Sequence, residues 1–293
     1  LCPTNMTTLL PSSKQSIDVT QFASVFAERD PASHKGTFGC AAIVGGAPGM
    51  VGAAVLAART ALKSGSGRVY AGLAQETTDF KLDIIQPEVM WRDVADLTSL
   101  ANQITAWGVG CGLGDSAYSL HCLKSVFAHR NSQPLVVDAD ALNALARGDV
   151  SQTWGEGPVV LTPHPAEAAR LLNTDTANVQ ADRIGAAKKL SATYHAWVVL
   201  KGQHSVVCNP EGHHQINPTG NVGLATAGSG DVLTGLITSF LAQGFAPDVA
   251  VPAAVWLHGT AADRLLQTQG GPIGMTAGEL IDVIRALRNS IKA

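Results

Sequence analysis

A glycine-rich segment that ends at an acidic residue is a clear chemical signal in this sequence. Gly228, Ser229 and Gly230 directly precede Asp231, and the apolar-periodic stretch 231–243 that follows is typical of a helix. Because the two glycines carry no side chain, backbone N–H groups and the positive end of the helix dipole can approach a phosphate or a developing oxyanion closely. A single Asp on a first helical turn more often only complements the dipole. The surrounding glycines favour a catalytic role for all four residues.

Carboxylates and an amide follow a second apolar run. Asp138, Asp140 and Asn143 come directly after residues 135–137, which are typical of a buried strand. Such a cluster suits a substrate hydroxyl or a hydrated Mg²⁺. A capping Asp with a solvated neighbour is the commoner explanation of a single Asp-x-Asp.

A histidine and a lysine end two further apolar runs. His164 stands between two prolines after residues 158–161, and the prolines favour a stiff, extended turn that positions a hydrogen-bond donor. A lone histidine is more often structural. Lys201 and Gly202 follow residues 197–200, where an ammonium group could meet a phosphate, although a lysine at a surface turn is the simpler explanation.

Glycine-rich turns also follow the strands expected at 40–44 and 105–109. Each turn alone is a weak signal. Together with the segment before Asp231 they would line one crevice at the carboxyl ends of neighbouring strands. The sequence contains no G-x-x-x-x-G-K-[S/T] loop, no G-x-G-x-x-G after a strand and no G-x-S-x-G, which disfavours Walker-type ATPases, ordinary Rossmann dehydrogenases and α/β hydrolases.

The elements that must position these residues alternate between short β-branched runs and Ala/Leu-rich stretches, which is typical of βαβ units. We predict an α/β fold: a three-layer α/β/α sandwich with a mostly parallel central sheet and a helical C-terminal third. One domain is expected over 1–293, with 1–32 as an N-terminal extension. The expected strands are 40–44, 68–71, 105–109, 135–137, 158–161, 197–200, 205–208 and 213–216, the last two paired antiparallel. The expected helices are 51–64, 116–128, 141–146, 165–172, 181–194, 231–243, 247–267 and 276–289.

Composition restricts the class of partner. Of 293 residues, 46% are apolar and 15% charged, with a formal net charge of −3 and no basic run, which excludes disorder and supports neither a nucleic-acid nor a membrane-surface partner. No apolar run reaches the roughly 18 residues that cross a bilayer, and no signal peptide is evident, so we expect a soluble cytoplasmic protein with Met6 a candidate first residue. The five cysteines form no C-x-x-C pair and are expected to be reduced and buried.

Taken in order, these blocks resemble the nucleotide-dependent NAD(P)H-hydrate dehydratases, members of the ribokinase-like superfamily. The similarity runs from about Arg29 to the C-terminus. The matching blocks are Ser33-His-Lys-Gly36, the 46–52 turn with Ala53, Gly65-Ser-Gly67, Gly110-Cys-Gly-Leu-Gly114, Asp138-Ala-Asp-Ala-Leu-Asn143, Leu161-Thr-Pro-His-Pro-Ala-Glu167, Leu200-Lys-Gly202 and 217–235. Cys111 stands where the family often has proline, and Ala166 where it often has glycine.

The resemblance implies repair of NADHX and NADPHX, hydrated forms of NADH and NADPH. ADP, or less favourably ATP, would phosphorylate the ring hydroxyl, and phosphate elimination would restore the dihydropyridine. Asp231 would orient and deprotonate that hydroxyl, with its own pKa lowered by the helix dipole. The amides of residues 228–230 would hold the transferring group.

The resemblance also implies two sets of binding residues. The hydrated nicotinamide nucleotide would contact Ala53, Gly112, His164 and Asp231, with Asp140 and Asn143 as second-tier candidates. The adenine nucleotide would contact Lys201, Gly202, Gln203, His204, Ser205, Asn221 and Gly230. Mg²⁺ is expected on the nucleotide phosphates, with its protein ligands unknown. An NAD(P)HX epimerase is the expected functional partner, since the segment before Ser33 is too short to hold that domain, and a homotetramer is a further expectation.

Two other functions stay open on the sequence. A ribokinase-like vitamin or sugar kinase would share the fold and Asp231 but release a stable phosphorylated product. A non-catalytic nucleotide-binding module would bind through the glycine turns without turnover, and the intact Asp231 argues against it.

Overall fold

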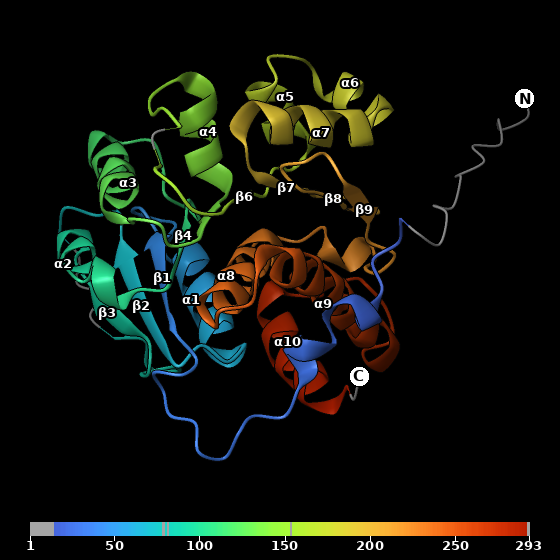
Figure 1. The fold of residues 1–293 in the computed structure, drawn as a ribbon, viewed down its shortest axis with the longest axis horizontal. Helices are drawn as coiled ribbons and strands as arrows, with labels where there is room; N and C mark the ends of the chain where they lie inside the picture. The colour runs from blue at the N-terminus through green and yellow to red at the C-terminus, as the bar shows by residue number, and fades with distance from the viewer. Residues whose placement is uncertain (1–14, 78–79, 81, 153, 292–293) are drawn as a thin grey trace, which may run out of the picture.

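A computed structural model describes residues 15–77, 80, 82–152 and 154–291. Within them the chain forms one nine-stranded sheet in the order β3-β2-β1-β4-β5-β6-β7-β8-β9 (Figure 1). Strands β1 to β7 pair in parallel, and β8 and β9 pair antiparallel at one end. The strands are β1 (Cys40–Gly45), β2 (Arg68–Leu73), β3 (Met90–Arg92), β4 (Ala106–Val109), β5 (Leu135–Val137), β6 (Val159–Leu161), β7 (Trp197–Leu200), β8 (Val206–Cys208) and β9 (His214–Ile216).

Helices cover both faces of this sheet. The α-helices are α1 (Val51–Lys63), α2 (Val94–Ser99), α3 (Ala117–His129), α4 (Ala139–Arg147), α5 (Pro165–Leu171), α6 (Thr176–Ala181), α7 (Arg183–Tyr194), α8 (Ser229–Ala242), α9 (Pro247–Thr268) and α10 (Ala277–Ser290). Three 3₁₀ segments join them: η1 (Val19–Phe26), η2 (Ala101–Gln103) and η3 (Val222–Leu224). Helices α8 to α10 gather on one side of the sheet, and α3 to α5 lie on the other (Figure 1).

Alternation along each strand builds two cores. In β1, Ala41 and Ile43 point into the core under α1, α8, α9 and α10, whereas Ala42 and Val44 point into the core under α2 to α7. Both sets are fully buried because helices cover both faces, which explains why the strands are continuous apolar runs rather than alternating ones.

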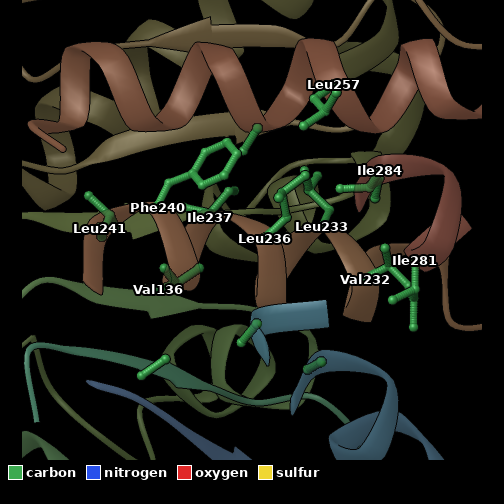
Figure 2. Close-up of a cluster of buried hydrophobic side chains, with 14 of the residues drawn as sticks. Val136, Val232, Leu233, Leu236, Ile237, Phe240, Leu241, Leu257, Ile281 and Ile284 are labelled. Carbon is green, nitrogen blue, oxygen red and sulfur yellow. The ribbon is translucent and has the colours of Figure 1, made fainter. Parts of the chain in front are cut away.

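Helix α8 is the central helix of the first core. Every residue from Val232 to Ala242 is buried, and its apolar side chains meet Leu257 of α9 and Ile284 of α10 (Figure 2). The helix packs closely on α1: a Cβ on Gly235 would lie 2.2 Å from the carbonyl oxygen of Ala57. This tight seating fixes the position of the helix N-terminus, where the candidate catalytic residues lie.

The sheet order reverses between β1 and β4. From β1 the chain moves outward to β2 and β3, then returns to place β4 on the other side of β1. The turns that follow β1 and β4 contact each other at this reversal, because the Gly46 N–H donates to the Cys111 carbonyl at 2.9 Å. Ligands of doubly wound sheets bind beyond the carboxyl ends of strands at such a reversal.

Residues 15–26 pack along β9, the edge strand of the sheet, and against the helical layer. Ile17 N–H donates to the Ile216 carbonyl at 3.0 Å, and Ile216 N–H donates to the Gln15 carbonyl at 2.7 Å. Phe22 and Phe26 of η1 then pack on Trp256 of α9. Residues 15–26 therefore run along β9 and onto the helical layer.

The predicted fold class is confirmed, including the parallel sheet, the antiparallel β8–β9 hairpin and the helical C-terminal third. Elements that the sequence analysis did not predict are β3, α2, α6 and the three 3₁₀ segments. The single domain over 1–293 stays a prediction.

Four cysteines, Cys40, Cys111, Cys122 and Cys208, are free and buried as expected, and Cys2 lies outside the described residues. Across the described ranges, no helix has both the length and the apolar character that a membrane crossing requires.

Candidate active site

The N-terminus of α8 opens toward the carboxyl ends of the central strands. Gly228 is the N-cap residue with φ of 89°, a left-handed conformation that favours glycine, and a Cβ there would also lie 2.5 Å from the end of the Leu56 side chain. The Ser229 hydroxyl donates to the Leu224 carbonyl at 2.8 Å, and its backbone N–H donates to the Thr226 carbonyl at 3.4 Å. An amide on the first turn of a helix has no intrahelical acceptor, so those of Gly230 and Asp231 suit an anion.

A buried ion pair lies directly beneath this turn. Asp138 accepts from Lys201 Nζ at 2.7 Å and from the Thr234 hydroxyl at 2.8 Å, and a Cβ on Gly230 would lie 3.3 Å from the same Nζ. Asp138 makes no side-chain capping bond, so the capping explanation considered for it is wrong. The ends of β5 and β7 and the start of α8 thus bring Asp138, Lys201 and Gly230 together.

Lys201 stays charged in this position. Burial alone would lower its pKa, but the carboxylates of Asp138 and of Glu167, whose Oε2 lies 4.0 Å from Nζ, together raise the pKa above its usual value. The ammonium group is therefore held as a fixed positive charge beside the start of α8, where a phosphate would benefit from it.

Asp231 has an unusual acidity. Burial, and after it the carboxylate of Asp138, raise the pKa of Asp231 to about 6. The expectation that the helix dipole would lower this pKa is wrong, because desolvation and a second carboxylate outweigh the dipole. A hydrogen bond from the Cys111 thiol and the charge of Lys201 act in the lowering direction. With its pKa near 6, Asp231 can take up a proton and still be mostly ionised at neutral pH.

This acidity predicts a pH dependence. Because the pKa of Asp231 is about 6, kcat/KM is expected to fall about tenfold per unit as pH drops below that value. Replacing Cys111 by alanine removes the hydrogen bond that lowers this pKa, so the acidic limb should move to higher pH. Profiles of kcat/KM from pH 5 to 8.5 measure both effects. Cys122→Ala, which removes another buried thiol, is the control, and an unmoved limb in Cys111→Ala would contradict the assignment.

His164 lies where the sequence predicts a positioned donor. It is the N-cap residue of α5, and its Nδ1 accepts from the amides of Ala166 and Glu167 at 3.1 and 3.3 Å. Nδ1 is therefore an acceptor, and in the neutral ring Nε2 carries the proton. Burial, and then Lys201, lower the His164 pKa, which favours that neutral form. His164 caps its helix, and its Nε2 lies 3.3 Å from Glu167 Oε1, so the structure shows a structural role and the contact with a ligand stays a prediction.

The remaining substrate candidates surround the reversal in strand order. Asp140 accepts from the Gly114 amide at 2.8 Å, and Asn143 accepts from Arg170 at 2.8 Å, so both side chains have structural partners. Gly112, with φ of 58°, lies against the first turn of α1: a Cβ there would lie 3.0 Å from the Ala53 Cβ. Ala53 and Gly112 are therefore neighbours, as a shared binding role requires.

The seven candidate nucleotide-binding residues line one cavity of ≈ 500 Å³. They are Lys201, Gly202, Gln203, His204, Ser205, Asn221 and Gly230. Segment 217–225 and part of α9 complete the walls. Ser229, which belongs to the candidate catalytic turn 228–231, also lines the cavity. A nucleotide in this cavity could direct its phosphates toward the start of α8.

Several residues of this region were not predicted from the sequence. Glu167 and Thr234 belong to the Lys201–Asp138 network, and the Cys111 thiol contacts Asp231. His258 of α9 lines the cavity, and burial lowers its pKa to about 4. Each stands inside an ordinary helical or turn pattern, so no local signal marked them. Glu167, Cys111 and Thr234 lie inside blocks that carry the family resemblance, which was their one signal, and His258 lies outside those blocks.

Cys111, Asp138 and Asp231 place one ligand atom each within 4.8 Å of one another. These residues do not fit a Mg²⁺ centre held by the protein. Burial raises the Cys111 pKa, so its sulfur is a protonated soft donor, and the Lys201 ammonium already occupies Asp138. A Mg²⁺ ion would have to be held by nucleotide phosphates.

Comparison with known proteins decides the family. Residues 41–286 match the family described as NAD(P)H-hydrate dehydratase. The chain belongs to this family. An ADP-dependent (S)-NAD(P)H-hydrate dehydratase of Neisseria meningitidis serogroup B is 47% identical over 273 residues, covering 92% of each chain.

Two further family members differ in organisation. A bifunctional NAD(P)H-hydrate repair enzyme of Moorella thermoacetica is 42% identical over 89% of this chain, which spans only 51% of that longer protein. The crystal structure of the ADP/ATP-dependent NAD(P)H-hydrate dehydratase of Bacillus subtilis, co-crystallised with ATP and Mg²⁺, superimposes with a TM-score of 0.80 at 32% identity, covering 93% of this chain and 96% of that one. The predicted family is confirmed.

Proposed function

We propose that this chain dehydrates NADHX and NADPHX to NADH and NADPH at the expense of ADP. The observation that carries the proposal is Asp231 at the start of α8, with its pKa raised to about 6, close to the Lys201–Asp138 pair and directly after Ser229 and Gly230, which line the nucleotide cavity. Family membership and the similarity to a dehydratase named ADP-dependent support the same activity.

The proposed chemistry solves a leaving-group problem. The hydroxyl on the hydrated ring attacks the terminal phosphorus of ADP, the bond from that phosphorus to the bridging oxygen breaks, and AMP departs. Asp231 accepts the hydroxyl proton. The ring C–O bond then breaks, phosphate carries away the electron pair, and loss of a proton from the neighbouring atom restores the double bond.

Different residues bind the phosphoryl group, the adenine nucleotide and the hydrated nicotinamide nucleotide. The amides of residues 228–230 hold the transferring phosphoryl group, and Lys201 balances its charge. Residues 201–205, Asn221 and Gly230 bind the adenine nucleotide. Ala53, Gly112 and His164 contact the hydrated nicotinamide nucleotide, with Asp140 and Asn143 as second-tier candidates. Asp140 also holds the turn at 110–114 through the Gly114 amide, and Asn143 accepts from Arg170.

The cellular setting stays a prediction. Mg²⁺ accompanies the nucleotide phosphates, and the co-crystallisation of the Bacillus subtilis relative with ATP and Mg²⁺ supports this. An NAD(P)HX epimerase is the natural partner, and the two-activity organisation of the longer relatives supports it. We place the enzyme in the cytoplasm, as a homotetramer.

Absorbance at the reduced-nicotinamide band tests the proposal. Protein is mixed with NADHX and Mg²⁺, in parallel with ADP, with ATP and with no nucleotide. A rise with ADP is the expected result, and a smaller rise with ATP is compatible with it. No rise with either nucleotide, from protein shown to be folded by circular dichroism, would overturn the proposal.

Mass spectrometry of the products distinguishes the dehydratase from the other candidate enzyme. A vitamin or sugar kinase, which shares Asp231 and the fold, would accumulate a stable phosphorylated alcohol.

A further inference from the structure

One wall of the nucleotide cavity has little regular structure of its own. Segment 217–224 contributes six residues to the lining: Asn217, Thr219, Gly220, Asn221, Val222 and Leu224. Only its last three residues form a short 3₁₀ turn, η3. The shape of this wall must therefore come from contacts with its neighbours.

Helix α9 supplies these contacts at the start of the wall. Asn217 Nδ2 donates to the Val255 carbonyl at 3.3 Å, and the Thr219 hydroxyl donates to the Trp256 carbonyl at 2.9 Å. Both bonds use side chains of the wall and backbone acceptors of the helix. They fix the first residues of the segment but not its middle.

Asp263 of α9 holds the middle of the wall. One oxygen of its carboxylate accepts from the Gly220 amide at 2.9 Å, and the other accepts from Asn221 Nδ2 at 3.0 Å. Asn221 Oδ1 in turn accepts from the Gly223 amide at 2.9 Å, which continues the chain of bonds into η3. Asp263 is partly buried and is not among the residues that line the cavity, so it acts from behind the wall.

We infer that Asp263 is a positioning residue for the adenine nucleotide: its carboxylate holds segment 217–224 in the shape that bound ADP requires. The inference rests on the proposed function, since it takes the cavity as the ADP site. A wall that is already ordered loses little conformational freedom when the nucleotide binds, whereas a released wall must be ordered at that moment. Hydrogen bonds to an ionised carboxylate are the strong kind, so two of them suffice to hold a short segment.

This role predicts a separation of kinetic constants. Replacing Asp263 by alanine removes both acceptors, so the KM and the Kd for ADP are expected to rise about tenfold or more, while kcat changes less than about twofold because Asp231 and Lys201 are untouched. Asp248→Ala is the matched control, since it removes an exposed carboxylate from the same helix without a contact to the wall. A merely structural role would lower the melting temperature without this selective change in KM.

Two further variants keep the test sharp where the alanine variant folds poorly. Asp263→Asn retains one acceptor oxygen for the Gly220 amide and should show an intermediate Kd. Asn221→Ala removes the side chain that donates to Asp263. Because both substitutions remove the same hydrogen bond, the double variant should raise the Kd by less than the product of the two single fold-changes.

Isothermal titration with ADP alone measures Kd without NADHX, so this inference and the proposed function can fail separately. Protein that binds ADP but turns over no NADHX contradicts the proposed function, and the Kd comparison still judges Asp263. A Kd for Asp263→Ala within twofold of the unsubstituted protein, or a fall in kcat at unchanged KM, would overturn the positioning role.

Discussion

Replacing Asp231 by asparagine is expected to lower turnover of NADHX at least about a thousandfold while the chain stays folded. Asparagine has the same shape as aspartate but cannot accept a proton from the ring hydroxyl. The side chain also contributes part of the charge that orients that hydroxyl. Initial rates of NADH formation at saturating ADP, for the variant and the unsubstituted protein at pH 7.5, give the comparison.

The same substitution should make the protein more stable at neutral pH. The pKa of Asp231 is about 6 when folded and about 3.8 in an ordinary environment, so the ionised form is disfavoured by folding. That penalty is complete above pH 6, shrinks as pH falls, and vanishes below about 3.8. The difference between these two pKa values sets the penalty at no more than about 3 kcal/mol. Thermal melts at pH 7.5 and 4 measure it.

Together the two measurements separate chemistry from folding. A variant that melts higher and is inactive identifies Asp231 as a residue retained for catalysis at a cost in stability. Near-normal turnover by the asparagine variant would refute the assigned role, whatever its melting temperature.

Replacing Arg130 by methionine is expected to cost about 3–5 kcal/mol of folding free energy, one of the largest losses available to a single substitution in this chain. The Arg130 side chain is fully buried after α3 and donates to the backbone carbonyls of Gln133, Trp154 and Glu156. Burial lowers its pKa to about 10, so it remains charged at neutral pH. Methionine fills similar volume but leaves these buried acceptors unpaired.

Chemical denaturation monitored by circular dichroism measures the loss. Arg147→Met is the control: that side chain is 46% exposed in a surface ion pair with Asp149, and its removal should change the free energy of unfolding by less than about 1 kcal/mol. An Arg130 variant as stable as this control would show that the loop at 154–158 does not depend on the guanidinium group.

The sheet and the long helices could be predicted because their signals are local. Residues 40–45 and 135–137 are apolar on both faces, and Pro165 and Pro247 begin helices where the missing N–H costs nothing. Strand β3 was missed because its three residues, Met90 to Arg92, include an exposed arginine and carry no alternating pattern long enough to detect. It forms because β2 offers it a pairing edge.

The sequence predicted which residues stand at the ends of elements, but not which of their side chains contact one another. Asp231, Lys201 and His164 each end or begin an element that the pattern reveals. The contacts of Asp138 with Lys201 and Thr234 join residues that are 63 and 96 positions apart, and only the fold brings them within hydrogen-bonding distance. The direction of the Asp231 pKa shift was predicted wrongly for the same reason, since burial and the carboxylate of Asp138, distant in the sequence, raise this pKa.

The short pairing of residues 15–17 with β9 bears on how the protein behaves in concentrated solution. Strand β9 ends the sheet, and its outer hydrogen-bonding groups at Ile216 are taken up by Gln15 and Ile17. Unpaired groups on a terminal strand can bond to the same strand of another molecule, which is a route to aggregation. Gln15 and Ile17 thus shield this position of the edge strand, and shortened forms that begin after Ile17 are expected to self-associate more readily.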